Sequence, residues 1–403
     1  MKLIRFSVLT CSVLLTLFLP SAFANHRTGS DAIPELLVAG DFNGDGNLDL
    51  AVHVSGFDMV GIFLGNGHGN FTLNGHIRLD TLPKGLATAD INRDGKLDLV
   101  NCNAWGYNVR VLLGDGLGGF NSTKELNADG GPVRLIVRDF NKDGRLDIAV
   151  NAPDEGAILV YFGDGQGGFV TPAEELDDIP QPFGLAAGDF NRDTNLDIAT
   201  TTRNGTGADG SRVAIFEGNG AGKFARGTEF QVGQLPTSLQ AHDMNNDGIV
   251  DLLVAGLGRT PNIDPLAGEG NFISSFLGDG AGKFTLKQTL HFGAGNGKFD
   301  MAVGDFDEDG DLDVALAQTG IQSDIHTDNL LLFFGDGTGK LVKGPTVTVG
   351  KEPHTVVSAD FNKDGHLDLA VTNRTDGTVS VLLGNGTGRF AVDSTFSVIV
   401  PTP

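Results

Sequence analysis

The chain has 403 residues, of which 51 are acidic and 28 are Lys or Arg, so its formal net charge is −23. A charge of this sign makes nucleic acid and other polyanions poor partners. The hydrophobic content of 40% argues against a disordered acidic chain. With 59 Gly, 2 Cys and 1 Trp, the composition does not suit a large conventional enzyme domain and favours an internal repeat.

The first predicted element is a leader at residues 1–24. Lys2 and Arg5 precede a short apolar run, and the segment ends on Ala24, which is typical of a cleavable secretory signal peptide. The apolar run is shorter than the roughly 18 residues that a membrane-spanning helix needs. We therefore predict a secreted protein, extracellular or periplasmic, that is cleaved after Ala24 and does not insert in a membrane. Residues 25–33 are predicted to form an N-terminal linker.

Cleavage of this leader changes both the thiol content and the charge. It removes Cys11 and leaves Cys102 as the single thiol, so the mature chain forms no internal disulfide. The leader carries two cations and no acid, so the charge of the mature chain is −23 − 2 = −25. The fold therefore needs another source of stability, and bound cations would also explain the concentration of carboxylates.

A nine-residue acidic motif recurs along the mature chain. The first copy, from Asp41 to Asp49, reads Asp-Phe-Asn-Gly-Asp-Gly-Asn-Leu-Asp. Later copies begin at Asp90, Asp139, Asp189, Asp243, Asp305 and Asp360. The intervals between starts are 49, 49, 50, 54, 62 and 55 residues, by subtraction. Each interval holds about four short strands with their turns.

Every unit has the same order of parts, which we call strands A to D. In the second unit, Pro83 opens an apolar strand A, the acidic loop follows, and Leu97 begins strand B. Proline stands at this strand entry in six of seven units, and Lys298 replaces it in the sixth. Strand C ends in a Gly-Asn-Gly or Gly-Asp-Gly turn, which is typical of a tight hairpin. Strand D is predicted to start at Phe71, Phe120, Phe169, Phe224, Phe284, Leu341 or Phe390.

Seven units of four antiparallel strands predict an all-β fold, a seven-bladed β-propeller spanning residues 34–400. A linear solenoid is the alternative, but neither end carries a distinct polar capping unit. The tail from Ala391 to Val400 is either the last strand D or a strand that pairs with the first blade. The predicted blades are 34–80, 83–129, 132–179, 182–233, 236–292, 298–349 and 353–400.

The acidic loops between strands A and B have the chemistry of calcium sites. Calcium takes six to eight oxygen ligands, and alternate side chains of an Asp-x-Asn-x-Asp-Gly turn point inward. Position 7 adds a backbone carbonyl, and the Asp at position 9 closes the site because these loops lack the Glu at position 12 of an EF-hand. The alternative is a set of water-exposed Asx turns, but close carboxylates repel one another unless a cation neutralises them. We predict up to seven Ca²⁺ ions.

The predicted ligands, with position 7 of each loop acting through its carbonyl, are Asp41, Asn43, Asp45, Asn47, Asp49, Asp90, Asn92, Asp94, Lys96, Asp98, Asp139, Asn141, Asp143, Arg145, Asp147, Asp189, Asn191, Asp193, Asn195, Asp197, Asp243, Asn245, Asp247, Ile249, Asp251, Asp305, Asp307, Asp309, Asp311, Asp313, Asp360, Asn362, Asp364, His366 and Asp368. The loops are not equal. Loop 6 replaces the usual Asn by Asp307 and should bind most tightly. Loop 4 has Thr194 where a sharp turn requires Gly and should be the weakest site.

The motif Asp-x-Asn-x-Asp-Gly-x-x-Asp-Leu followed by Leu-Leu-Gly-Asn-Gly-x-Gly-x-Phe, as in Asp360 to Phe390, resembles the FG-GAP/VCBS repeat family. The resemblance covers nearly the whole mature chain. It implies a seven-bladed propeller similar to the integrin α-subunit head and to fungal lectins, with calcium between the first two strands of each blade. Thr194 and Leu341 depart from the pattern. Members range over adhesion, sugar binding and modules attached to enzymes, so the resemblance leaves the function open.

A ligand surface is predicted on the face opposite the acidic loops. The B–C connections are long in three consecutive units, at Thr201–Arg212, Leu257–Asn271 and Gln318–Asn329, which indicates either a binding rim or tolerated insertions. Trp105 and Tyr107 lie in the B–C connection of the second unit, where they either stack on a ligand such as a sugar ring or pack against the neighbouring blade.

The sequence shows no serine elbow, cysteine pair or metal spacing of histidines. His242 beside Asp243, and His354 near Asp360, are better explained as structural groups than as acid–base pairs. We therefore expect no enzyme but a secreted recognition or adhesion module for an extracellular protein or glycan. The alternatives are a propeller enzyme that acts on an extracellular polysaccharide through its channel, and a scaffold without a small ligand.

Overall fold

The computed structural model describes residues 32–79, 82–203, 211–258, 270–293, 299–319, 321–322, 325–326 and 328–398. The predicted signal peptide and most of the predicted linker lie outside these residues. Throughout the described ranges the regular elements are strands, and they contain no helix long and apolar enough to cross a membrane.

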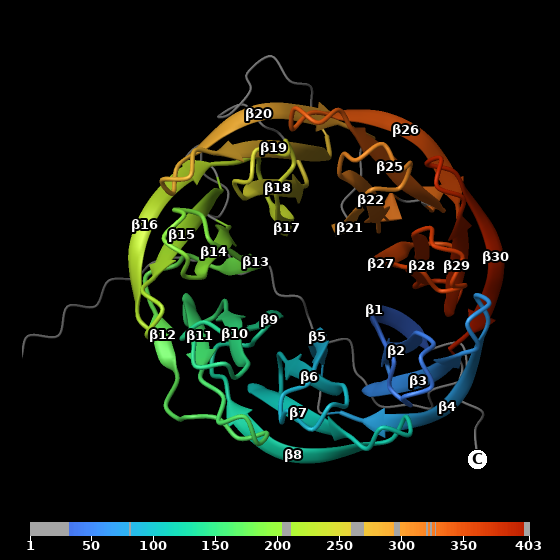
Figure 1. Cartoon of the computed structure of the whole chain (residues 1–403), viewed down its shortest axis with the longest axis horizontal. Coiled ribbons are helices and arrows are strands. Elements are labelled where there is room, and N and C mark those ends of the chain that lie inside the picture. The colour runs from blue at the N-terminus through green and yellow to red at the C-terminus, as the bar shows by residue number, and fades with distance from the viewer. Residues whose placement is uncertain are drawn as a thin grey trace, which may run out of the picture.

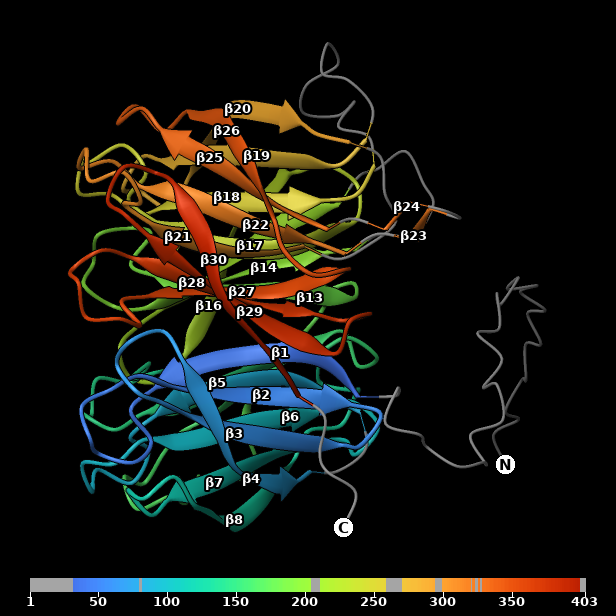
Figure 2. The ribbon, with the colours of Figure 1, turned by 90° about the vertical axis from the view of Figure 1, so that its right-hand side faces the viewer.

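Seven four-stranded antiparallel sheets surround a central axis (Figure 1). Within every sheet the strands follow one another in chain order, and the first strand of each lies innermost (Figure 1). Viewed edge-on, the sheets are stacked side by side like blades (Figure 2). The prediction of a seven-bladed all-β propeller with four-stranded blades is confirmed.

The first three blades cover the N-terminal part of the described chain. Blade 1 contains β1 (Ile33–Gly40), β2 (Asp49–Ser55), β3 (Met59–Gly65) and β4 (Phe71–Arg78). Blade 2 contains β5 (Pro83–Ala89), β6 (Asp98–Asn103), β7 (Asn108–Gly114) and β8 (Phe120–Asn127). Blade 3 contains β9 (Arg134–Arg138), β10 (Asp147–Ala152), β11 (Ala157–Tyr161) and β12 (Glu174–Leu176).

The remaining four blades have the same composition. Blade 4 contains β13 (Pro182–Gly188), β14 (Asp197–Thr202), β15 (Arg212–Gly218) and β16 (Phe224–Gln231). Blade 5 contains β17 (Pro236–His242), β18 (Asp251–Gly256), β19 (Phe272–Gly278) and β20 (Phe284–His291). Blade 6 contains β21 (Phe299–Gly304), β22 (Asp313–Gln318), β25 (Asn329–Gly335) and β26 (Leu341–Thr348). Blade 7 contains β27 (Pro353–Ala359), β28 (Asp368–Asn373), β29 (Thr378–Gly384) and β30 (Phe390–Ser397).

The three long connections occur between the second and third strands of blades 4, 5 and 6, as predicted. In blade 6 the connection contains a separate two-stranded ribbon of β23 (Ile321–Gln322) and β24 (Ile325–His326). Most of the other two connections lies outside the described residues.

The outer strand of blade 3 differs from the prediction. Six strands D start at the predicted residue, but β12 starts at Glu174, and Phe169 makes only an isolated bridge to Gly163. Pro172 lies between them and has no N–H to donate to a ladder, which explains why the strand begins late.

The hydrophobic core consists of seven clusters, and each lies at one junction between neighbouring blades. Five junctions contain an edge-to-face pair between the aromatic residue at loop position 2 and the first residue of strand D in the next blade, as for Phe42 and Phe120. At the other two, Ile91 packs in the cluster of Phe169, and Met244 in that of Leu341. Burial between blades therefore provides the main stabilisation of the ring.

The ring closes without exchange of strands. Blade 1 is built from the N-terminal end of the described chain, and the tail forms β30, the last strand D of blade 7. The junction between these blades has its own core cluster, which includes Phe63, Phe361 and Val398. Residues 391–397 of the tail thus belong to the last strand of their own blade rather than to a strand paired with the first blade, and residues 399 and 400 lie outside the described residues.

Candidate calcium loops and a central channel

The seven acidic loops share one backbone geometry that depends on the Asp at position 9. In loop 1, Asp49 is fully buried, and its two carboxylate oxygens accept the N–H groups of Phe42 and Gly65, both at 2.8 Å. The same pair of bonds occurs in the other six loops. The carboxylate therefore ties the acidic loop to the end of strand C. Each oxygen keeps a second lone pair for another ligand.

The Asp at position 1 shapes the loop from its other end. In all seven loops its Oδ2 accepts the N–H of position 6, as Asp41 does from Gly46 at 2.8 Å. The Oδ1 of position 5 accepts the N–H of position 7 in every loop, as Asp45 does from Asn47 at 2.7 Å. These bonds hold the backbone of each acidic loop in a tight turn.

The turn needs two departures from ordinary backbone conformation, at positions 4 and 6. Position 6 has a φ between +73° and +92° and is Gly in every loop except loop 4, where Thr194 has a φ of +73°. Position 4 also has a positive φ, and in six loops a non-Gly residue such as Arg93 or Lys142 occupies it. Left-handed backbone is unfavourable for residues with a Cβ, and most of all for a β-branched one. Thr194 therefore has the left-handed conformation that the sequence predicts for the Gly position of this turn.

Loop 6 has the densest group of carboxylates. One oxygen from each of Asp305, Asp307 and Asp313 lies within 4.8 Å of the others. Oδ1 of Asp307 is buried and has no hydrogen-bond partner. Burial, reinforced by the charges of Asp309 and Asp305, raises the pKa of Asp307. A cation bound between these oxygens would offset their mutual repulsion and partner the buried Oδ1.

The buried Asp at position 9 of each loop has a raised pKa. Burial raises the pKa of Asp147, Asp197, Asp251 and Asp313 to about 6, against the lowering effect of their two backbone hydrogen bonds. Burial raises the pKa of the equivalent residues of loops 1, 2 and 7 as well. A bound dication would favour the ionised form at these positions.

Position 7 contributes differently from the other predicted ligands, because its side chain varies. Arg145 approaches Asp143 of its own loop at 3.6 Å, and Lys96 approaches Asp94 at 4.0 Å. His366 pairs instead with Glu308 of the neighbouring loop 6. These side chains are cations or pair with carboxylates, so only the backbone carbonyl of position 7 is suited to act as a ligand.

Trp105 and Tyr107 lie in the turn between β6 and β7, at the end of blade 2 that is opposite its acidic loop. Their exposed fractions are 63% and 46%, and Tyr107 has a φ of +50°. Trp105 therefore does not bury itself against a neighbouring blade.

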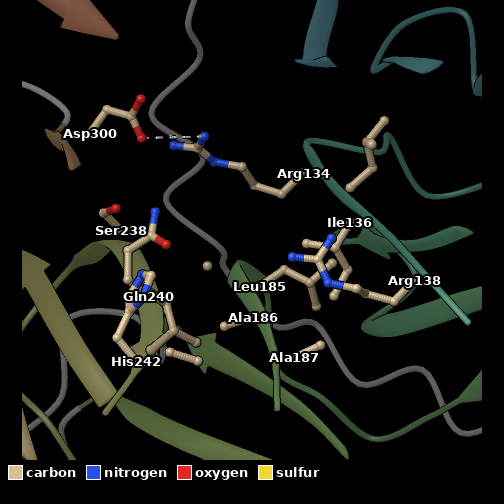
Figure 3. A pocket seen from close by; sticks show the side chains of 14 residues that line it. Arg134, Ile136, Arg138, Leu185, Ala186, Ala187, Ser238, Gln240, His242 and Asp300 are labelled. Carbon is tan, nitrogen blue, oxygen red and sulfur yellow. Dashed lines mark ion pairs between the residues drawn. The ribbon is translucent and has the colours of Figure 1, made fainter. Parts of the chain in front are cut away.

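The central channel is lined by the innermost strands. A cavity of about 240 Å³ lies between β9, β13, β17 and β21, and its polar side chains are Arg134, Arg138, Ser238, Gln240, His242 and Asp300 (Figure 3). An adjoining cavity of about 210 Å³ shares Arg134, Gln240 and Asp300. Arg134 of blade 3 reaches Asp300 of blade 6 at 3.9 Å (Figure 3).

The two histidines that the sequence placed near acidic loops have separate roles. His354 contacts the carbonyl oxygen of Glu35 through Nδ1 at 2.7 Å, which joins blade 7 to blade 1. His242 lines the channel, and burial lowers its pKa.

Sequence comparison matches the repeat directly. The family model described as FG-GAP-like repeat matches residues 41–101, 90–150, 139–200 and 263–316, and that described as FG-GAP repeat matches residues 353–389. The first three matches each begin at the first Asp of an acidic loop. The chain belongs to the FG-GAP repeat family. No curated protein sequence matches it.

Solved structures share the fold of this FG-GAP protein at low sequence identity. A putative 6-phosphogluconolactonase from Bacteroides fragilis is 15% identical with a TM-score of 0.62, and the match covers 93% of this chain and 97% of that chain. A protein from Lactobacillus plantarum is 12% identical with a TM-score of 0.62, covering 91% and 97%. BBS1N, solved in complex with ARL6DN, is 11% identical with a TM-score of 0.58, covering 86% and 91%. These likenesses concern the fold alone.

The channel residues of this FG-GAP propeller are the group that sequence reasoning missed. Arg134, Ser238 and Asp300 each stand five residues before an acidic loop, and Arg138 and His242 stand one residue before one. These positions share one side of strand A, since side chains alternate along a strand. Polar residues there, where other blades carry small or apolar ones such as Gly85 and Ala359, were the available signal.

Proposed function

We propose that this FG-GAP protein is a secreted, calcium-stabilised β-propeller that recognises an extracellular protein or glycan without catalysis. Export is supported by the cationic and apolar pattern of residues 1–24. Membership of the FG-GAP family supports calcium binding and recognition only in part, because a fold family specifies a scaffold rather than one ligand.

The proposal of calcium rests on loop 6. Three carboxylate oxygens converge within 4.8 Å, and the buried Oδ1 of Asp307 has no partner. Asp305, Asp307, Asp309 and Asp313, with the carbonyl of Asp311, would hold the ion, and the equivalent positions would do so in the other loops. Calcium supplies the charge that allows these carboxylates to remain ionised and close together.

The proposal of recognition rests on the exposure of Trp105. An indole with an exposed fraction of 63% in a short turn presents a rigid amphipathic surface, which suits stacking on a sugar or contact with a protein. Tyr107 lies two residues away in the same turn, and its exposed fraction is 46%. A similar propeller solved in complex with another protein supports a binding role.

The test is a screen of a glycan array and of extracellular partners with three proteins: the wild type, Trp105→Ala and Leu117→Ala. Leu117 is the matched control, because it is also exposed, at 75%, but lies in the turn between β7 and β8 at the metal end. We expect binding by the wild type and by Leu117→Ala, and loss of binding in Trp105→Ala. Turnover of a polysaccharide would replace this proposal by an enzyme, and absence of any binding would replace it by a scaffold.

A further inference from the structure

The channel carries an excess of positive charge in a strongly acidic protein. The charged side chains that line the cavity of about 240 Å³ are Arg134, Arg138 and Asp300, two cations against one anion. The formal charge of the whole chain is −23. Cations that line a cavity attract anions more strongly than the same charges on an open surface.

A third arginine, Arg203, lines neither cavity but is near enough to Arg134 to respond to its charge. Burial, together with the nearby charge of Arg134, lowers the pKa of Arg203 to about 10. Arg203 lies over the ring of Phe183 at 3.5 Å and donates to the carbonyl of Pro236 at 3.2 Å. Its position is therefore fixed by the structure, and the like charges of Arg134 and Arg203 are held near each other.

The two arginines that line the cavity differ in their partners. Arg134 faces Asp300 at 3.9 Å, which is long for a charge-assisted hydrogen bond. Arg138 is exposed, and its Nη1 donates to the backbone carbonyl of Val137 at 2.8 Å. Among the described residues, no ion pair joins Arg138 to a carboxylate. Its guanidinium lies at the cavity, across from Gln240 and His242 (Figure 3).

We propose that this channel binds a small organic anion bearing a carboxylate or a phosphate group. Arg138 is the primary anchor, Arg134 supplies further positive charge, and Gln240, Ser238 and His242 from blade 5 offer hydrogen bonds to the uncharged part. A guanidinium presents paired donors that match both anions. The two adjoining cavities, about 240 and 210 Å³, admit a molecule the size of a single sugar rather than a polymer.

The proposal does not depend on calcium or on Trp105, so its failure and that of the proposed function are distinguishable. The experiment is calorimetric titration of calcium-saturated protein with D-glucuronate, with glucose 6-phosphate and with glucose. We expect at least one of the two anions to bind and glucose not to bind. The stronger of the two identifies the acidic group that the channel prefers.

Variants locate the site. Arg138→Gln should weaken binding by about tenfold or more, because it removes a charged hydrogen-bond donor. Arg78→Gln is the control, since Arg78 is an exposed arginine on the outer strand β4, and it should bind like the wild type. Asp300→Asn should tighten binding, because it removes the competing carboxylate, and misfolding does not produce such a gain. Equal binding of glucose and both anions, or equal losses in Arg138→Gln and Arg78→Gln, would overturn the proposal.

Discussion

Gly69 donates its N–H to the carbonyl oxygen of Phe361 at 3.3 Å, across the junction between the first and the last blade. The equivalent bond joins Gly118 of blade 2 to Phe42 of blade 1 at 3.0 Å, between two consecutive blades. Gly282 and Gly388 make it at two further junctions. The first and the last blade are therefore joined by the same contact that joins consecutive blades.

This equivalence predicts that equivalent substitutions at the two kinds of junction lower the free energy of unfolding by the same amount. Phe361→Ala removes an almost completely buried ring that packs edge to face with Phe71. Phe140→Ala removes the equivalent ring of loop 3, which packs edge to face with Phe224. Each should lower the free energy of unfolding by about 3–5 kcal/mol. Chemical denaturation in calcium measures both. A much smaller loss for Phe361→Ala would mean that the ring is held mainly by its interior junctions.

Glu35 predicts a dependence of stability on pH. Its side chain is 8% exposed and pairs with Lys84 of blade 2 at 3.0 Å and with Arg374 of blade 7 at 3.1 Å. Burial alone would raise its pKa, but Lys84, His354 and Arg374 together lower it from 4.5 to about 2. This difference corresponds to roughly 3 kcal/mol. Because the pKa is lowered on folding, the stabilisation is present above pH 4.5 and is lost as the pH falls toward 2.

Glu35→Gln should therefore be destabilised by roughly 2–3 kcal/mol at pH 7, and its difference from the wild type should shrink as the pH falls below 4.5. Thermal unfolding in chelator from pH 7 to pH 2.5 measures this difference, and subtraction removes the titration of groups common to both proteins. Glu229→Gln, in an exposed ion pair with Arg212, is the control and should change stability by less than about 1 kcal/mol. A difference that is independent of pH would contradict the role of the Glu35 charge.

Thr194 offers a test of backbone strain. Thr194→Gly should stabilise the protein by about 1 kcal/mol, because Gly adopts a positive φ without strain. The reverse change, Gly144→Thr in loop 3, should destabilise by a similar amount. A Cβ at Gly144 meets no atom within 4 Å, so conformation rather than crowding would be responsible. Calcium affinity should rise in the first variant and fall in the second, as measured by titration; the opposite order would remove strain as the reason for ranking loop 4 last.

Asp307 predicts opposite effects with and without metal. Asp307→Asn gives loop 6 the amide that the other loops have, and it removes a carboxylate whose charge is repelled by Asp309 and Asp305. In chelator the variant should unfold at a higher temperature than the wild type, because repulsion falls. In calcium the order should reverse, because a charged ligand is lost. If the variant is more stable under both conditions, loop 6 is not a metal site.

The repeat made much of the fold predictable from sequence. Acidic loops of fixed length, Gly-rich turns and apolar strands specify blade number and strand order locally, so six of seven starts of strand D were correct. The predicted start of strand D at Phe169 was wrong, because Pro172, three residues later, prevents continuous pairing. The positive φ at position 4 was missed because residues such as Lys142 carry no signal for it.

Long-range relationships were the part that sequence could not supply. Arg134 and Asp300 are far apart in the chain and meet only because the ring brings blades 3 and 6 to one channel. The closure of the ring by β30 within its own blade likewise depends on packing between blade 7 and blade 1. Local patterns specify a blade, whereas contacts between blades determine the channel.

The central claim is that the acidic loops bind calcium and that calcium stabilises the propeller. The direct measurement is calcium titration of chelator-treated protein by calorimetry, with thermal unfolding recorded before and after. We expect several ions per chain, up to the seven loops of the sequence, and a melting temperature that rises by roughly 10 °C or more. Absence of calcium binding, with the same melting temperature in chelator and in calcium, would contradict the claim.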